Sequence, residues 1–236
     1  MYNVDPSANM NALSELLQQR RDSTHVISRL KRTYHRQFLP TSSNIRYNLV
    51  VASRSFFEVG DLTSRAKTVD ILWRKVMPGG FLVLVETGSY HGHSLLMALR
   101  DYLIDICRIE RQKYSLSSPI NVFAPCTHAK ECPLLDTGDP CNFTVKYLPL
   151  EPKAVHANEQ FSFVVLEKAE GELAEQPRIV KPVLKRRGHV IMRVCAPDGQ
   201  LRELVATKAR QGTACLQLCR NSREGDFAPV TMFKLE

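Results

Sequence analysis

The sequence predicts an α/β protein: a parallel sheet, a cysteine-rich loop and a small β-rich C-terminal lobe. Short apolar runs alternate with amphipathic helical patterns, which is typical of buried parallel strands and their covering helices. Three cysteines then fall in a Pro- and Gly-rich loop, and two strand-like runs flank an Asp-Gly turn. We expect residues 1–176, including the loop at 119–143, to form the α/β domain and residues 177–236 to form the lobe.

The N-terminal residues predict the end of a strand followed by a helix. Residues 1–5 suit a strand, and Asp5-Pro6-Ser7 supplies the chemistry of a helix start. The apolar residues that follow have helical spacing: Met10, Leu13, Leu16 and Leu17. A basic segment at 20–37 and a turn at 40–44 come next.

A strand–helix–strand–helix unit follows. We expect strands at 47–53 and 81–86, a helix at 61–77 that Pro78-Gly79-Gly80 stops, and a long helix at 93–112. The first helix should turn one face inward: Leu62, Ala66, Val69, Leu72, Trp73 and Val76. The second should do the same with Leu95, Leu96, Leu99, Leu103, Ile104 and Cys107. This order predicts a parallel sheet built from βαβ units.

The remaining segments are of a different kind. Residues 119–142 form a loop longer than structureless loops usually are, which indicates a function of its own. We expect a strand at 161–166 and a linker at 167–178. The lobe should contain a hairpin of His189–Cys195 and Leu201–Thr207 joined through Asp198-Gly199.

Composition narrows the class of protein. The chain has 236 residues, of which 44% are hydrophobic and 24% charged, which excludes collagen, coiled coil and wholesale disorder. No apolar run approaches the roughly 18 residues of a membrane span, so we expect no membrane partner. The net charge of +8 divides into +4 over 1–48, −3 over 49–176 and +7 over 177–236. Two basic ends predict a polyanionic partner, most readily nucleic acid; solubilising surface charge is the alternative.

Cysteine usage predicts a reducing compartment. Seven unevenly spaced cysteines do not make the disulfide framework of a secreted protein of this length. The first basic residue is Arg20, so the N-terminus is not an Arg-rich amphipathic transit peptide. Any organellar targeting signal is expected to have been removed or to lie outside this sequence.

The unit from Leu49 to Glu86 resembles the second half of a class I methyltransferase-like Rossmann sheet. That fold binds S-adenosylmethionine at the carboxyl ends of its early strands, after a Gly-rich turn. An acid after the second strand takes the ribose hydroxyls, and Asp5 occupies that position. The sequence contains neither the first strand nor its turn, so we expect an incomplete sheet kept as a scaffold, with no catalytic residues. An S-adenosylmethionine-dependent RNA methyltransferase is the alternative, and it would need that turn from elsewhere.

Cys126, Cys132 and Cys141 lie within 16 residues, with turn-forming residues between them. Thiolates gathered by turns are typical ligands of zinc and of iron–sulfur centres. The spacing C-x₅-C-x₈-C is not that of a zinc finger. A fourth ligand is needed, and both His128 and Cys195 are candidates; three unrelated buried thiols are the alternative.

The other cysteines predict packing. Cys107 lies on an apolar helical stripe and should belong to the core, and Cys215 and Cys219 could share a helix face. The lobe also carries basic residues suited to phosphate contact, unless they form an ordinary solvated face. They are Lys185, Arg186, Arg187, Lys208 and Arg210.

Motifs along nearly the whole chain resemble those of one family, the methyltransferase-like protein 17 or Rsm-type proteins of the mitochondrial small ribosomal subunit. The matching segments are Val4-Asp5-Pro6-Ser7, Leu49 to Ser53, Pro78 to Glu86, Ala124 to His128, Cys132-Pro133-Leu134, Cys141-Asn142-Phe143, Phe161 to Leu166, Lys185 to Val190 and Cys195-Ala196-Pro197. The cysteine signature is the specific part of this resemblance.

The resemblance implies a 4Fe–4S cluster on Cys126, Cys132, Cys141 and Cys195, with zinc as the alternative metal. It also implies a location in the mitochondrial matrix and a part in assembling or stabilising the small subunit. Expected partners are small-subunit ribosomal RNA, mitoribosomal proteins and another chain that completes the Rossmann sheet.

Overall fold

The computed structural model describes residues 1–18, 33–41, 44–114, 119–149, 155–169 and 176–229. The chain divides into two compact units, Met1–Ile45 and Arg46–Glu236. None of the helices in these described ranges is both long and apolar enough to cross a membrane.

The N-terminal unit contains β1 (Tyr2–Val4), α1 (Ala8–Gln18) and β2 (Tyr34–Arg36). β1 pairs in parallel with β2, and the rings of Tyr2 and Tyr34 stack with their centroids 5.1 Å apart. The predicted strand end and helix are confirmed. Most of the predicted basic segment at 20–37 lies outside the described residues.

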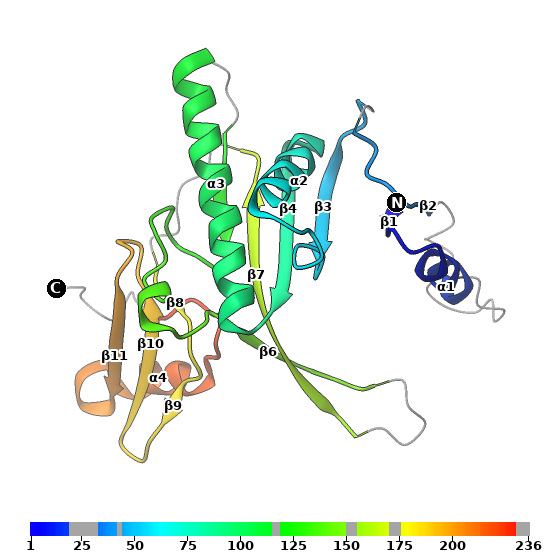
Figure 1. Cartoon of the computed structure of the whole chain (residues 1–236). Coiled ribbons are helices and arrows are strands. Elements are labelled where there is room, and N and C mark those ends of the chain that lie inside the picture. The colour runs from blue at the N-terminus through cyan, green and yellow to red at the C-terminus, as the bar shows by residue number, and fades with distance from the viewer. Residues whose placement is uncertain (19–32, 42–43, 115–118, 150–154, 170–175, 230–236) are drawn as a thin grey trace. The chain divides into compact units, whose positions relative to one another are not determined.

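The larger unit begins with β3 (Tyr47–Ser53), α2 (Leu62–Lys75), β4 (Val76–Thr87) and α3 (Tyr90–Tyr114). β3 and β4 pair in parallel, so the predicted βαβ unit is confirmed (Figure 1). It gives the protein the predicted mixed α/β character.

The rest of the five-stranded sheet is antiparallel. It consists of β5 (Asn121–Ala124), β6 (Phe143–Tyr147) and β7 (Ala157–Glu167), and the strand order is β3-β4-β7-β5 with β6 beside β7. The predicted parallel sheet is therefore only partly parallel, because β7 runs against β4, β5 and β6. β7 follows β6 as a hairpin, and a hairpin imposes antiparallel pairing.

Helix α2 matches its prediction except at its two ends. The Asp61 carboxylate accepts a hydrogen bond from the Ser64 N–H and caps the helix. Leu62 was expected to face inward but is 71% exposed, because it lies in the first turn, beside the cap. The helix ends at Lys75 and β4 begins at once, so the Pro78-Gly79-Gly80 segment lies inside the strand rather than ending the helix.

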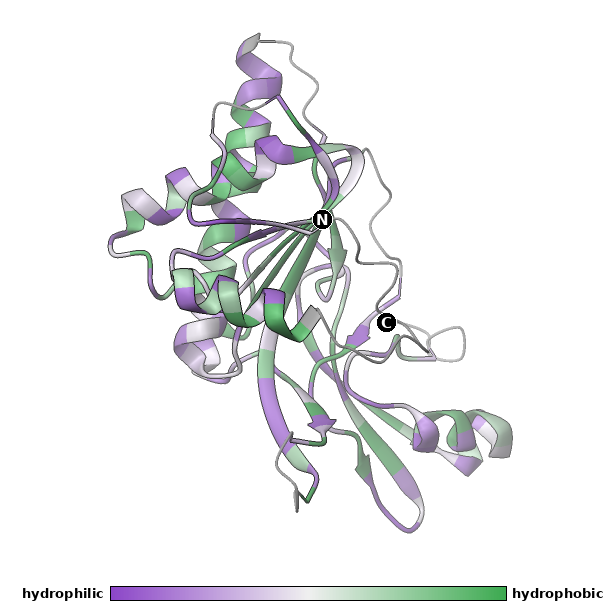
Figure 2. Cartoon of the chain, turned by 90° about the vertical axis from the view of Figure 1, so that its right-hand side faces the viewer, coloured by the Kyte–Doolittle hydropathy of each residue, from purple (hydrophilic) through white to green (hydrophobic). Residues whose placement is uncertain are grey.

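Helices α2 and α3 cover the same face of the five-stranded sheet. Residues on that face are fully buried on β4 and β7: Leu82, Leu84, Val164 and Leu166. The six α3 residues predicted to point inward are all buried. Figure 2 shows that the central strands are mostly hydrophobic. On the other face, Leu49 and Val51 of β3 are more than half exposed.

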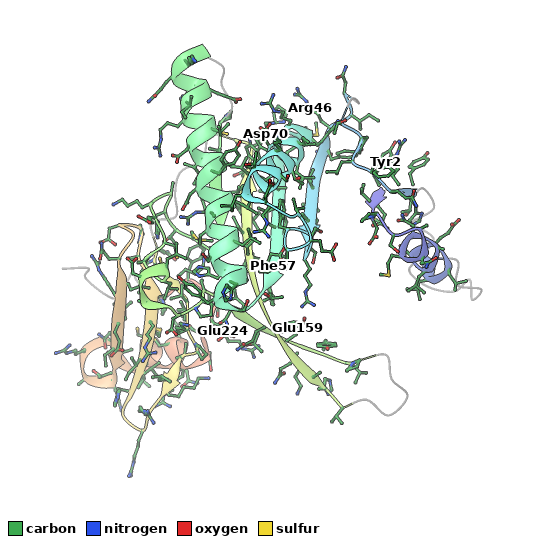
Figure 3. All side chains as sticks on the ribbon, viewed as in Figure 1. Tyr2, Arg46, Phe57, Asp70, Glu159 and Glu224 are labelled. Carbon is green, nitrogen blue, oxygen red and sulfur yellow. The ribbon has the colours of Figure 1, made fainter. Side chains whose placement is uncertain are left out.

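The lobe has its own sheet: β8 (Arg178–Ile179), β9 (Leu184–Lys185), β10 (His189–Cys195) and β11 (Leu201–Thr207), followed by α4 (Lys208–Asn221). The predicted hairpin is confirmed residue for residue, and Gly199 in its turn has a φ of +84°. Glu224, labelled in Figure 3, accepts a hydrogen bond from the Thr144 N–H of β6 at 3.1 Å. The predicted domain boundary at residue 177 stays a prediction.

Candidate metal centre and basic surface

The loop between β5 and β6 is held in shape by its own turns. The 3₁₀ turn Leu135–Thr137 follows Cys132, whose carbonyl accepts a hydrogen bond from the Leu135 N–H at 3.2 Å. Gly138 then takes a φ of +72°, which glycine adopts without strain. Cys132 and Cys141 are buried on either side of this turn, and Cys126 is half-buried.

Side chains of the sheet and of α3 fix the loop against the α/β body. The Ser162 hydroxyl donates to the Cys141 carbonyl at 2.8 Å, and the Asn142 amide donates to the Gly88 carbonyl at 2.7 Å. Arg100 of α3 donates to the Lys130 carbonyl at 2.7 Å. The two buried thiols of the loop therefore sit on a rigid base.

The lobe brings Cys195 to this loop. Cys195 ends β10 and is buried, and its carbonyl accepts a hydrogen bond from the Thr127 hydroxyl at 3.3 Å. The Lys130 ammonium donates to the Asp198 carbonyl at 2.9 Å, and the Lys181 ammonium donates to the Pro140 carbonyl at 3.0 Å. The loop is thus the contact through which body and lobe meet around Cys195.

The four predicted metal ligands lie within electrostatic range of one another. Burial raises the pKa of Cys132 to about 11 and that of Cys195 to about 12, and neighbouring cysteines add to both shifts. Burial also raises the pKa of Cys141, with further contributions from Cys126, Cys132 and Cys195. As free thiols, Cys132, Cys141 and Cys195 keep their protons at neutral pH. A thiophilic metal could bind here by displacing those protons.

Three nitrogen-bearing side chains surround the thiols. The Arg100 guanidinium donates to Cys126 Sγ at 3.1 Å, His93 Nε2 lies 3.6 Å from Cys132 Sγ, and His128 Nε2 lies 3.1 Å from Cys195 Sγ. Burial, and then the charge of Arg100, lowers the pKa of both histidines, that of His93 to about 4. Both imidazoles are therefore neutral at physiological pH.

Within the described part of the chain, no group of three or more His, Cys, Asp or Glu side chains has the arrangement of a metal site. The donor chemistry nevertheless suits a soft metal, because all four predicted ligands are thiols. Both candidates for the fourth position lie together: Cys195 meets the loop beside His128, with 3.1 Å between Nε2 and Sγ. The ligand set stays a prediction.

The three cysteines not predicted as ligands are buried. Cys107 lies on the inner face of α3, as predicted. Cys215 and Cys219 share one face of α4, with their sulfur atoms 4.0 Å apart in the core of the lobe. Burial and the neighbouring Cys215 raise the pKa of Cys219 to about 12.

The predicted phosphate-contacting residues gather at one end of the lobe. Lys185 ends β9, and Arg186 and Arg187 lie in the exposed turn between β9 and β10. His189 pairs with Thr207, so Lys208 and Arg210 begin α4 beside that turn. Arg220 joins them from the end of α4 by donating to the Arg186 carbonyl at 2.5 Å. This basic end (Lys185, Arg186, Arg187, Lys208, Arg210 and Arg220) is one surface.

Asp5 has a local partner in the N-terminal unit. Its carboxylate accepts a hydrogen bond from the Ser7 N–H at 2.8 Å, and the Ser7 hydroxyl accepts one from the Met10 N–H at 3.3 Å. These bonds organise the start of α1. The ribose-binding role of Asp5 stays a prediction.

Sequence reasoning missed His93 and Arg100, although the signal was present. Both lie on the apolar stripe of α3, seven residues apart, and their exposed fractions are 1% and 0%. A charged residue inside such a stripe needs a buried partner. Arg100 finds such partners in the Lys130 carbonyl, Asp101 and Cys126.

The family described as Mitochondrial small ribosomal subunit Rsm22 matches residues 1–229 of this chain. The human ribosome assembly protein METTL17, mitochondrial, is 39% identical over 236 residues, which cover 96% of this chain and 49% of that protein. Rsm22-cox11 tandem protein 2, mitochondrial, of Schizosaccharomyces pombe is 29% identical over 233 residues, covering 81% of this chain and 30% of that protein. This chain therefore spans about half the length of the human relative.

A solved structure of an S-adenosylmethionine-dependent methyltransferase from Methanosarcina mazei aligns with 72% of this chain and 82% of its own, at 12% identity and a TM-score of 0.34. That likeness is too weak to carry an argument. The relatives' names confirm the predicted mitochondrial location.

Proposed function

The chain belongs to the Mitochondrial small ribosomal subunit Rsm22 family, and we propose that it acts as a component or assembly factor of that subunit. In this proposal the basic end of the lobe binds ribosomal RNA. A structural 4Fe–4S cluster on Cys126, Cys132, Cys141 and Cys195 fixes the lobe to the α/β body. Mitoribosomal proteins are the expected neighbours.

The position of Cys195 carries the proposal. The loop supplies three thiols from the body, and the lobe supplies the fourth where Thr127 and His128 contact it. Iron–sulfur clusters use such sets of four cysteine thiolates. A bond to metal at Cys195 would add a covalent link to the hydrogen bonds that already join the loop to the lobe.

The basic end of the lobe supports the RNA-binding part of the proposal. Residues 177–236 carry a net charge of +7. Five cations of the basic end are exposed, which suits phosphate contacts that are independent of base sequence: Lys185, Arg186, Arg187, Lys208 and Arg210. Because the cluster would hold this surface in place, loss of the cluster should also weaken RNA binding.

Alanine substitution of Cys195 tests the proposal. Cys215→Ala is the matched control, because it makes the same change at a buried cysteine of the same lobe. After anaerobic purification, Cys195→Ala should lose iron and sulfide and bind a small-subunit ribosomal RNA fragment more weakly. Cys215→Ala should keep both properties. A Cys195→Ala protein with full iron content and RNA affinity would refute the proposal.

A further inference from the structure

We propose that Arg100, assisted by His93 and His128, is the group that compensates the negative charge of the sulfur site and sets its reduction potential. This inference rests on the proposed cluster. It assigns a role to three residues that do not ligate metal, and each lies against a different sulfur atom.

The side chain of Arg100 is fully buried. Its donors point to three acceptors: the Asp101 carboxylate, the Lys130 carbonyl and the Cys126 sulfur. Asp101 is 36% exposed, so water weakens its compensation of the guanidinium charge. Burying a guanidinium is unfavourable unless it is well paired. The half-buried sulfur of Cys126 is a further acceptor for the guanidinium, 3.1 Å from it.

A neutral thiol is a poor partner for that guanidinium, since sulfur in S–H is a weak acceptor. A thiolate, free or bound to metal, accepts a charge-assisted hydrogen bond that is roughly twice as strong as a neutral one. Arg100 is therefore placed to donate such a hydrogen bond to a metal-bound thiolate at Cys126.

His128 also directs a hydrogen-bond donor at a sulfur atom, that of Cys195. Its Nδ1 accepts a hydrogen bond from the Lys130 N–H at 3.2 Å, so in the neutral imidazole the proton is on Nε2. That N–H faces Cys195 Sγ. His93 Nε2 lies next to Cys132 Sγ, and Lys181 acts electrostatically on Cys141. Nitrogen-bearing side chains thus lie near all four sulfurs, and Arg100 and His128 present N–H donors to two of them.

Donors and positive charge around metal-bound sulfur stabilise the reduced, more negative state and raise the reduction potential. Replacing Arg100 with methionine removes the charge and keeps the length of the side chain. Arg100→Lys keeps the charge and loses the planar fork. The matched control is Arg108→Met, because Arg108 is exposed on the same helix.

The experiment is a potentiometric titration of each anaerobically purified protein, with iron and sulfide counted in parallel. Arg100→Met should change the oxidised-to-reduced ratio at a fixed potential by about tenfold, a fall of about 59 mV for one electron. Arg100→Lys should lower the reduction potential by less, and Arg108→Met should have the wild-type potential.

The outcomes separate this inference from the proposed function. Wild type without iron and sulfide refutes the proposed function. Arg100→Met with wild-type iron and potential refutes the inference alone. If Arg100→Met loses its iron while Arg100→Lys keeps it, the result supports the inference that the sulfur site needs the positive charge at position 100. If both variants lose iron, His128→Leu decides: a lowered potential supports the donor shell, and an unchanged potential overturns it.

Discussion

His128 Nε2 lies 3.1 Å from the sulfur of Cys195, a residue 67 positions further along the chain. The preceding residue, Thr127, donates to the main-chain carbonyl of the same cysteine. Two adjacent loop residues therefore hold both the side chain and the backbone of Cys195. The position of the lobe is coupled to the cysteine loop through protein contacts as well as through any metal.

Thr127→Val should destabilise the protein by about 1 kcal/mol, because the Cys195 carbonyl would lose the hydrogen bond from the Thr127 hydroxyl while the shape of the side chain is kept. Urea unfolding measures the loss. Thr63→Val, at an exposed position on α2, should change little and serves as the control. Equal effects of the two variants would contradict the assigned contact.

Gly92→Ala should destabilise the protein by about 2–3 kcal/mol. A Cβ at this position would lie 2.1 Å from the Thr87 carbonyl oxygen, a backbone atom that cannot move aside. Gly92 lies in the first turn of α3, so the strain should also displace the neighbouring His93. Gly60→Ala is the control, because nothing lies within 4 Å of the added Cβ. Thermal unfolding should give a clearly lower melting temperature for Gly92→Ala than for Gly60→Ala.

Glu86→Gln tests a buried carboxyl group. Glu86 is 1% exposed; one oxygen accepts from the Phe56 N–H at 3.0 Å, and the other has no partner among the described residues. Burial raises the pKa of Glu86 above its ordinary 4.5.

The folded protein consequently binds this proton more readily than the unfolded chain. The free energy of unfolding of wild type should therefore rise relative to that of Glu86→Gln as the pH falls through the pKa of Glu86 in the folded protein. The rise should end once the pH is below 4.5, the ordinary pKa that applies to the unfolded chain. Urea unfolding of both proteins from pH 7.5 to 4 measures the difference. A difference that is constant over this range would contradict the raised pKa.

Replacing Lys185, Arg186 and Arg187 together with alanine should reduce the salt dependence of RNA binding. Each phosphate contact contributes about 0.7 to the log–log slope for single-stranded nucleic acid, so the slope should fall by about 2. Removing the same charge from the exposed part of α3, at Arg108, Arg111 and Lys113, is the control. An equal fall in the slope for the two triple variants would contradict the assignment of RNA binding to the basic end of the lobe.

Local patterns in the sequence predicted most of the elements. The β10–β11 hairpin was predicted to the residue because strand alternation and the Asp198-Gly199 turn act together. The inner face of α3 was predicted because its apolar period is long and regular. In both cases the signal lies within neighbouring residues.

Long-range relationships were not predictable in this way. The direction of β7 depends on its hairpin with β6, and β5 is too short to give a periodic signal. The choice between His128 and Cys195 could not be made from spacing, because it depends on how the lobe meets the loop. Arg100 could have been suspected from a charge inside an apolar stripe, but its partner Cys126 lies 26 residues away.

A count of iron and acid-labile sulfide in the anaerobically purified wild-type chain tests the central claim most directly. The account predicts about four iron atoms and four sulfides per chain, the content of one cluster on four cysteines. Zinc without sulfide, or a protein that binds no metal, would contradict it.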